Sequence, residues 1–173
     1  RGMSSAASDV YKRQAYTYQL DGVKFLSSHD NCLLADDMGL GKTLQALMAI
    51  EEGGRAIVIC PATLKLNWAN EVRKWRSDLS PVVCKGRKGF KLPAKNEVVI
   101  INYDILPTEF TPTSQWGDDS ENVSQAWRDV LAQTTLIADE AHLCKSHKAI
   151  RSKRTKVLSN LCKKSLSLIH ISE

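Results

Sequence analysis

The sequence predicts an α/β fold in which a mainly parallel sheet carries helices on both faces. Short apolar runs of strand length alternate along the chain with longer segments of helical periodicity. A glycine-containing polar loop follows the first apolar run, and two adjacent acids follow a later one. Because neighbouring parallel strands need connections as long as a helix, this alternation favours a parallel sheet that is covered on both faces.

In the first half of the chain, helix and strand signals alternate. Residues 16–29 (YTYQLDGVKFLSSH) are expected to form an amphipathic helix, and residues 32–35 (CLLA) a short buried strand. Residues 43–52 have the composition of a helix, which should end at the two glycines that follow. Residues 55–60 (RAIVIC) are expected to form a second buried strand that ends at Pro61.

The second half continues this pattern. Residues 63–75 are predicted to form a helix on a sheet, because they carry the apolar stripe Leu64, Trp68, Val72 and Trp75. The remaining expected elements are strands at 81–86, 97–102 and 134–138, a surface loop at 108–121, a helix at 123–132 and a basic helix at about 149–163. The tryptophans on helical stripes, Trp68, Trp75 and Trp127, are expected in the core, whereas Trp116 in the loop has no assigned place.

Composition limits the classes of protein that need to be considered. A chain of 173 residues that is 43% hydrophobic is long enough for one domain with a core, and its net charge of +5 is compatible with a polyanionic partner. None of the five cysteines forms a Cys-x-x-Cys pair, so we expect small buried residues rather than a metal site. No run approaches the roughly 20 apolar residues of a membrane span. We therefore expect a soluble intracellular protein, cytoplasmic, nucleoid-associated or nuclear, without a membrane partner.

The two ends of the chain, residues 1–14 and 166–173, have no clear place in this pattern. The DNA string gatgtgtataagagacag encodes DVYKRQ, residues 9–14, and its reverse complement encodes LSLIHI, residues 166–171. Both ends therefore match a translated sequencing-library adapter, once in each orientation, and we expect neither to be native or to belong to the fold. The native domain is then residues 15–165, and we expect it to be incomplete at its C-terminal side.

The segment ADDMGLGKTLQAL, residues 35–47, has the features of a phosphate-binding loop between a strand and a helix. Backbone N–H groups of such a loop surround phosphates at the N-terminus of a helix, where the helix dipole favours negative charge. The candidate nucleotide ligands are Met38, Gly39, Leu40, Gly41, Lys42 and Thr43. Lys42 would reach the β- and γ-phosphates and the Thr43 hydroxyl would help to hold Mg²⁺. Asp36 stands where the simplest form of the motif has its first glycine.

A second pattern, TTLIADEAH, places Asp139 and Glu140 directly after a buried strand. Ligands of parallel α/β sheets bind at the carboxyl ends of the strands, where both acids and the loop before Lys42 should emerge. Asp139 can bind Mg²⁺ through its water shell, and Glu140 can orient and deprotonate an attacking water. Glu140, Lys42 and Asp139 are therefore the candidate catalytic residues, with a nucleotide and Mg²⁺ as the expected cofactors.

The combination of DDMGLGKT and DEAH indicates a resemblance to a known family. Residues 15–165 resemble the first RecA-like lobe of superfamily-two helicases, a P-loop NTPase fold. The resemblance is strongest to the Swi/Snf-like DNA translocases, and within them to the HepA-related annealing-helicase branch. An acid in place of the first glycine is a trait of that group, which accounts for Asp36.

Further segments match the family in the expected order. YQLDGVKFL resembles its adenine-recognition motif, which implies that Gln19 reads the adenine edge. ICPATLKLNW and INYDIL resemble its DNA-gripping motifs. The residues that the resemblance marks as DNA-contact candidates are Pro61, Ala62, Thr63, Lys65, Asn102 and Tyr103. Several cations between Lys145 and Lys164 could also lie along DNA, or could form the solvated face of a helix packed on the sheet.

The resemblance implies an ATP-binding lobe of an ATP-dependent double-stranded DNA translocase that contacts the DNA backbone. In the family, a second RecA-like lobe in the same chain supplies an arginine finger, which is worth roughly 10³ to 10⁵ in rate. We therefore expect the intact parent to be an ATP hydrolase and the present chain to turn over ATP poorly. An RNA helicase lobe of the DEAH type and a nucleotide- or DNA-binding module without turnover remain the alternatives.

Overall fold

The computed structural model describes residues 30–37, 41–115, 117, 119–144, 146 and 148–171. Its centre is a six-stranded sheet in the order β1-β6-β5-β2-β4-β3, and every neighbouring pair is parallel. The strands are β1 (Asn31–Asp37), β2 (Arg55–Cys60), β3 (Ser80–Val83), β4 (Glu97–Asn102), β5 (Thr134–Asp139) and β6 (Lys164–Ile171). The expected parallel sheet is therefore confirmed.

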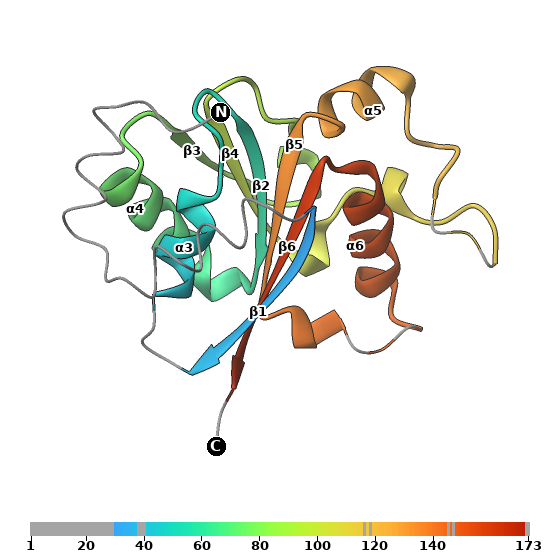
Figure 1. The fold of residues 1–173 in the computed structure, drawn as a ribbon. Coiled ribbons are helices and arrows are strands. Elements are labelled where there is room, and N and C mark those ends of the chain that lie inside the picture. Colours follow the sequence, from blue (N-terminus) through green and yellow to red (C-terminus); the bar gives the residue numbers. More distant parts are fainter. Residues whose placement is uncertain are drawn as a thin grey trace.

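Helices cover both faces of the sheet (Figure 1). The α-helices are α3 (Lys42–Met48), α4 (Lys65–Trp75), α5 (Gln125–Leu131) and α6 (Ile150–Leu161). Figure 1 shows α3 and α4 on one side of the strands and α5 and α6 on the other. Short 3₁₀ helices are η1 (Ala62–Leu64), η2 (Arg87–Gly89), η3 (Tyr103–Ile105), η4 (Thr108–Phe110) and η5 (Ala141–Cys144). The two layers were also predicted.

The core is divided by the sheet into two buried clusters. One cluster joins α3 and α4 to the sheet through residues such as Leu47, Trp68 and Val72. The other joins α5 and α6 to the opposite face through residues such as Leu131 and Val157. Alternate side chains of the central strands enter opposite clusters, as the two-residue period of a strand requires. This is why the strand segments are almost continuously apolar.

Most of the expected elements appear with shifted ends. Residues 81–86 were expected to be a strand, but β3 covers Ser80–Val83 and the chain then turns into η2. The predicted helix over 63–75 begins as η1 and continues as α4. The loop expected at 108–121 contains η4 at its start. The helix expected at 16–29 lies outside the described residues.

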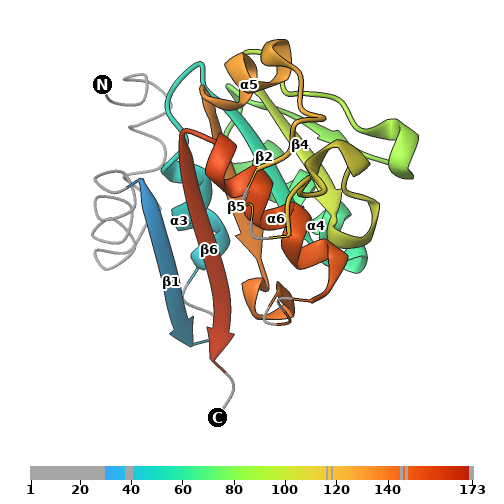
Figure 2. The same ribbon diagram turned by 90° about the vertical axis from the view of Figure 1, so that its right-hand side faces the viewer.

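The structure differs from the sequence analysis at its C-terminal strand. Residues 166–173 were expected to take no part in the fold, yet Lys164–Ile171 form β6 between β1 and β5 (Figure 2). The alternation of serine with leucine places Leu166 and Leu168 in the α3–α4 core, where both are almost fully buried. An alternating segment of this kind suits a strand whatever its origin, so the adapter hypothesis stays a prediction.

Candidate nucleotide and magnesium site

The backbone of Gly41 sets the end of the candidate phosphate loop. Its φ of 70° and ψ of 38° are left-handed, a region that favours glycine, and it is the N-cap of α3. Its carbonyl accepts the N–H of Gln45 at 3.0 Å, which begins the helix. Lys42, the first helical residue, is buried with 4% exposure, and Thr43 is half-buried. The predicted ligands Gln19, Met38, Gly39 and Leu40 lie outside the described residues.

The second half of the site is Asp139, the last residue of β5. Its side chain is 5% exposed and each carboxylate oxygen accepts a hydrogen bond. The indole Nε1 of Trp68 donates to Oδ2 at 2.9 Å, and the backbone N–H of Glu140 donates to Oδ1 at 3.0 Å. The carbonyl of Asp139 accepts the hydroxyl of Tyr103 at 2.6 Å. Asp139 is therefore held by contacts from α4, from η3 and from its own neighbour.

Glu140 follows in an uncommon backbone conformation. Its φ is 56°, in the left-handed region where few residues other than glycine are found. Its carboxylate Oε2 lies 3.2 Å from Nδ1 of His142, and the Glu140 side chain is 19% exposed. Glu140 therefore turns out of the strand line with its carboxylate within reach of solvent.

The sheet brings the two halves of the site to one edge. β1 and β5 flank β6 and run parallel to it, and Leu168 of β6 is paired with both Leu34 and Asp139. The loop after β1 and the acids after β5 therefore leave the sheet at the same carboxyl edge. This is the edge at which parallel α/β sheets bind ligands.

The donor set of this edge fits Mg²⁺ bound together with a nucleotide. Mg²⁺ usually takes one or two carboxylates, keeps several waters and fills its shell with substrate phosphates. Asp139 offers a nearly buried carboxylate and Thr43 a hydroxyl, and the described residues contain no cluster of three acidic, histidine or cysteine side chains. The arrangement thus suits a metal that arrives with phosphates rather than one held by the protein alone.

Cys60 ends β2 beside this edge and is fully buried in the α3–α4 core. Burial, and to a smaller degree the negative charge of Asp139, raises the pKa of the Cys60 thiol to about 12. The residue is therefore an uncharged member of the core at neutral pH, as expected from the cysteine pattern.

The segments that were expected to contact DNA follow β2 and β4 at the same edge. Ala62 and Thr63 are exposed and Pro61 is half-buried, so this turn presents polar and backbone groups to solvent. Lys65 instead uses its ammonium group internally, because Nζ donates to the Cys84 carbonyl at 2.9 Å and to Oδ1 of Asn102 at 3.0 Å. A hydrogen bond between Lys65 and Asn102 thus joins the start of α4 to the end of β4.

Comparison with known proteins decides the family. A model of the SNF2-related domain matches residues 18–167.

This chain belongs to the SNF2-related domain family.

Similar proteins include annealing helicases and remodelling ATPases. The DNA annealing helicase and endonuclease ZRANB3 of Bos taurus is 28% identical over 152 residues, which cover 84% of this chain and 13% of that protein. The ISWI chromatin-remodeling complex ATPase ISW1 of Saccharomyces cerevisiae is 32% identical over 158 residues, 80% of this chain and 13% of that protein. This chain thus spans about one eighth of the length of these relatives.

Solved structures agree on the fold. The Sulfolobus solfataricus SWI2/SNF2 ATPase core in complex with dsDNA matches with a TM-score of 0.66 and 24% identity, over 90% of this chain and 32% of that chain. The Sulfolobus solfataricus SWI2/SNF2 ATPase core domain matches with a TM-score of 0.61 and 25% identity, over 88% of this chain and 30% of that chain. The predicted Swi/Snf-like membership and RecA-like α/β fold are confirmed.

Two residues of this SNF2-related domain have contacts that the sequence analysis did not foresee. Trp68 was expected in the core, where it lies, but its indole also donates to Asp139. Tyr103 was expected to contact DNA, whereas it is 4% exposed and its hydroxyl is bonded to the Asp139 carbonyl. One signal was available for Trp68: a buried indole N–H usually needs an acceptor, and an acid was expected at the same edge.

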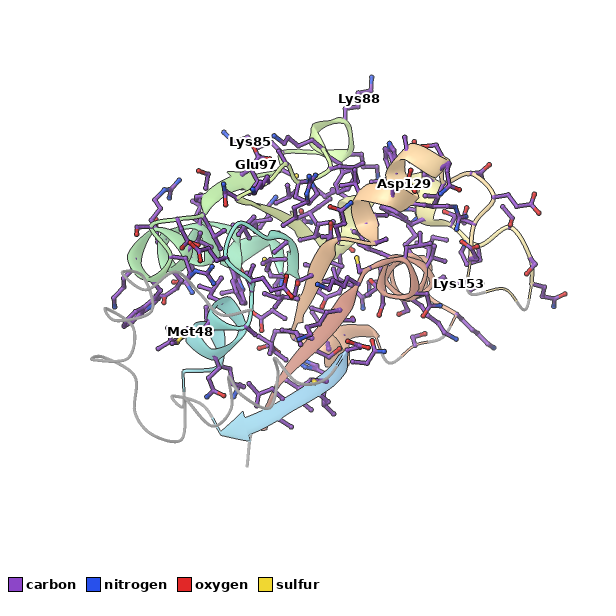
Figure 3. The ribbon with its side chains drawn as sticks, turned by 45° about the horizontal axis from the view of Figure 1, so that its top comes forward. Met48, Lys85, Lys88, Glu97, Asp129 and Lys153 are labelled. Carbon is purple, nitrogen blue, oxygen red and sulfur yellow. The ribbon has the colours of Figure 1, made fainter. Side chains whose placement is uncertain are left out.

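The basic segment of the domain does not form one uniform surface. Arg154 turns inward, is 8% exposed and donates to Oγ1 of Thr111 and to the Leu106 carbonyl. Lys163 is exposed and pairs with Glu51 at 3.0 Å. In Figure 3, Lys153 projects from the α6 side, whereas Lys85 and Lys88 project from a different part of the molecule. For α6 this agrees with the alternative of a solvated helix face. One side of α6 packs on the sheet, and Lys153 and Lys156 on its other side are exposed.

None of the helices among the described residues has the length and apolar character needed to cross a lipid bilayer.

Proposed function

We propose that this SNF2-related domain is the ATP-binding lobe of an ATP-dependent double-stranded DNA translocase. The observation that carries the proposal is the shared carboxyl edge, where Lys42 and Thr43 follow β1 and Asp139 and Glu140 follow β5. A cation and a hydroxyl on one side of that edge, with two acids on the other, form the donor set of an Mg²⁺-dependent nucleotide hydrolase.

Each side chain has a role in this proposal. Lys42 and the N-terminus of α3 bind the phosphates, and Gln19 and residues 38–41 complete the nucleotide contacts. Thr43 and Asp139 hold the metal, whose chemistry is to neutralise charge that develops on the phosphates. Glu140 orients the attacking water and accepts its proton. Its partly exposed position beside His142 is compatible with that role.

The partner in this proposal is the backbone of duplex DNA. The exposed turn over residues 61–63 lies at the same edge as the acids, so a strand bound there would be close to the nucleotide. Phosphate contacts of this kind supply affinity without sequence preference. The match to an ATPase core solved with dsDNA supports this partner over RNA. Asn102 and Lys65 remain candidates that would have to exchange their mutual hydrogen bond for phosphate.

The hydrolytic activity is proposed for the assembly with a second RecA-like lobe. This chain covers 32% of the solved ATPase core, and in the proposed assembly the second lobe supplies the arginine finger. The domain by itself should therefore bind ATP and release phosphate slowly. Brisk hydrolysis by this chain alone would contradict that assignment.

The first test is substitution of Lys42. Lys42→Ala should abolish Mg²⁺-ATP binding, because it removes the cation expected at the β- and γ-phosphates, whereas Lys85→Ala at an exposed lysine should leave binding unchanged. Fluorescence titration with a labelled ATP analogue measures both, with a thermal melt to confirm that each variant folds. Equal binding by Lys42→Ala and the wild-type chain would contradict the nucleotide site.

The nucleic-acid partner needs a separate measurement. Labelled duplex DNA and duplex RNA of the same length should be titrated with the chain at low and at moderate salt, since phosphate contacts weaken steeply with salt. Preference for DNA supports the translocase. Preference for RNA would favour the DEAH-type RNA helicase alternative.

A further inference from the structure

Two side chains from opposite layers hold the peptide that carries the catalytic acids. Trp68 reaches it from α4, on one face of the sheet, and Tyr103 reaches it from η3, in the cluster on the other face. We infer that Trp68 and Tyr103 are positioning residues, which fix Asp139 and Glu140 in the orientation that accepts Mg²⁺-ATP. The inference rests on the proposed function of this edge.

Trp68 fixes the carboxylate of Asp139. The terminal torsion of an aspartate is broad, so a carboxylate without partners samples many orientations. Here the indole donates to Oδ2 at 2.9 Å while the Glu140 N–H donates to Oδ1 at 3.0 Å. Donors on both oxygens from different directions stop the rotation, and each oxygen keeps a lone pair that can accept from water.

Tyr103 fixes the peptide group between Asp139 and Glu140. The C=O of this peptide accepts the Tyr103 hydroxyl at 2.6 Å, and its N–H donates to Oδ1 of Asp139. Both polar atoms of one peptide group are therefore held. A non-glycine residue with φ of 56°, as at Glu140, persists only where its surroundings determine the backbone. Tyr103 supplies part of that constraint.

The contact of Trp68 is distinct from simple core packing. A phenylalanine would occupy much of the same apolar space, but it could not donate to Asp139. A second tryptophan on the same helix gives a matched comparison, since Trp75 Nε1 donates to Oε2 of Glu71 at 2.7 Å on the flank of α4. Both indoles bind a carboxylate, but only the partner of Trp68 belongs to the proposed metal site.

The decisive experiment measures ATP binding by the 173-residue chain with Mg²⁺ and with EDTA. Residues that orient a metal ligand typically contribute 10- to 100-fold in metal affinity. Trp68→Phe and Tyr103→Phe should each lower the Mg²⁺-dependent gain in ATP affinity about tenfold. Their affinity in EDTA, and all values for Trp75→Phe, should equal those of the wild-type chain.

A second readout is measured on the wild-type chain, and variants serve only to assign its signals. In the ¹⁵N-labelled wild-type chain saturated with ATP, addition of Mg²⁺ should shift the indole N–H resonance of Trp68, because its acceptor is the proposed metal ligand. The resonance of Trp75 should stay in place. Trp68→Phe and Trp75→Phe assign the two signals, and either spectrum also reports whether the variant folds.

Three results would overturn the inference. The first is a Trp68→Phe chain with the wild-type Mg²⁺ gain, and the second is an indole resonance of Trp68 that ignores Mg²⁺. The third is an equal loss of affinity with Mg²⁺ and with EDTA, which would indicate a structural role alone. A wild-type chain that shows no Mg²⁺-dependent ATP binding would instead overturn the proposed function, and this inference with it.

Discussion

The two helical layers of this domain are attached to the sheet in different ways. The α3–α4 layer sends polar side chains to the carboxyl edge, where Lys42 begins α3 and Trp68 bonds Asp139. The α5–α6 layer is joined mainly by apolar contact, including Phe90, Phe110 and Trp127, whose ring centroids lie 5.6 to 6.0 Å apart. The α3–α4 layer thus contributes several polar groups to the carboxyl edge. The α5–α6 side contributes the Tyr103 hydroxyl and otherwise packs on the sheet through apolar contacts.

Among the described residues each layer also contains one buried arginine, and the two differ in their hydrogen-bond acceptors. Arg76 is 1% exposed, donates to both oxygens of Asp78, and donates to the Leu47 and Ile50 carbonyls at the end of α3. Arg154 has only neutral acceptors among the described residues, a threonine hydroxyl and a carbonyl. Burial lowers the pKa of Arg154, whereas the hydrogen bonds from Arg76 lower the pKa of Asp78.

The largest effect is expected at Arg76. Arg76→Ala leaves the partly exposed carboxylate of Asp78 and two buried carbonyls near the end of α3 without their donor. A buried acceptor without its donor costs roughly 1 to 3 kcal/mol, so the two carbonyls together should cost about 3 to 5 kcal/mol. Urea unfolding measures the change in free energy. Because Arg76 anchors the helix that follows the phosphate loop, ATP affinity should fall as well. Arg73→Ala, on the same helix but exposed, should change stability by less than about 0.5 kcal/mol.

A smaller and purely structural effect is expected at Arg154. Arg154→Ala leaves the Leu106 carbonyl and the Thr111 hydroxyl unsatisfied, a loss of roughly 1 to 3 kcal/mol in unfolding free energy. ATP affinity measured at a temperature where the variant is folded should equal that of the wild-type chain. A fall in ATP affinity comparable to that of Arg76→Ala would remove the functional difference between the layers.

The smallest expected effect is a difference between two buried cysteines, one in each layer, in how much they lower the stability of the fold at high pH. Burial raises the pKa of Cys60 to about 12, and burial also raises the pKa of Cys84, although Lys65 and Lys91 oppose that shift. A thiol whose pKa is raised by folding has no effect on stability below its unfolded value of 9.0 and destabilises the fold as pH rises from there toward the folded value. For Cys60 the loss should reach about 1 kcal/mol at pH 10.

The measurement compares slopes rather than absolute stabilities. Urea unfolding between pH 8 and 10 should show a shallower decline in Cys60→Ala than in the wild-type chain, while Cys84→Ala should follow the wild type more closely. The other titrating groups are common to all three chains, so they cancel in the comparison. Identical slopes in Cys60→Ala and wild type would show that the Cys60 thiolate is tolerated in the fold.

The sequence was sufficient for those parts of the fold that depend on local pattern. Continuous apolar runs identify β2, β4 and β5, because strands buried on both faces have no polar side. The stripe through Trp68 and Val72 identifies α4. The order of the strands in the sheet was not predicted, since parallel pairing depends on contacts between residues far apart in the chain. The C-terminal strand was not predicted because residues 166–173 were excluded as adapter-derived, although their alternation of serine and leucine is typical of a strand.

In the candidate site too, local motifs identify some residues, whereas contacts between distant residues could not be predicted. Lys42, Asp139 and Glu140 could be named from motifs that place them at strand ends, and the topology supports that placement. The hydrogen bonds from Trp68 and Tyr103 to Asp139 could not be predicted from motifs, because only the assembled layers bring these residues together. Lys65 and Asn102 show the limit most clearly, since two residues assigned to DNA are hydrogen-bonded to each other.

The place of β6 between β1 and β5 has a consequence for how this chain folds. Among the described strands, β1 pairs only with β6, so the first strand must wait for residues 164–171 before it joins the sheet. Pairing across more than 130 residues closes a long loop and is slow to form. During synthesis, α4, α5 and the strands between them can assemble first. In this order the candidate phosphate loop meets the acids in the last step. If it binds nucleotide as proposed, ATP binding should report the completion of folding.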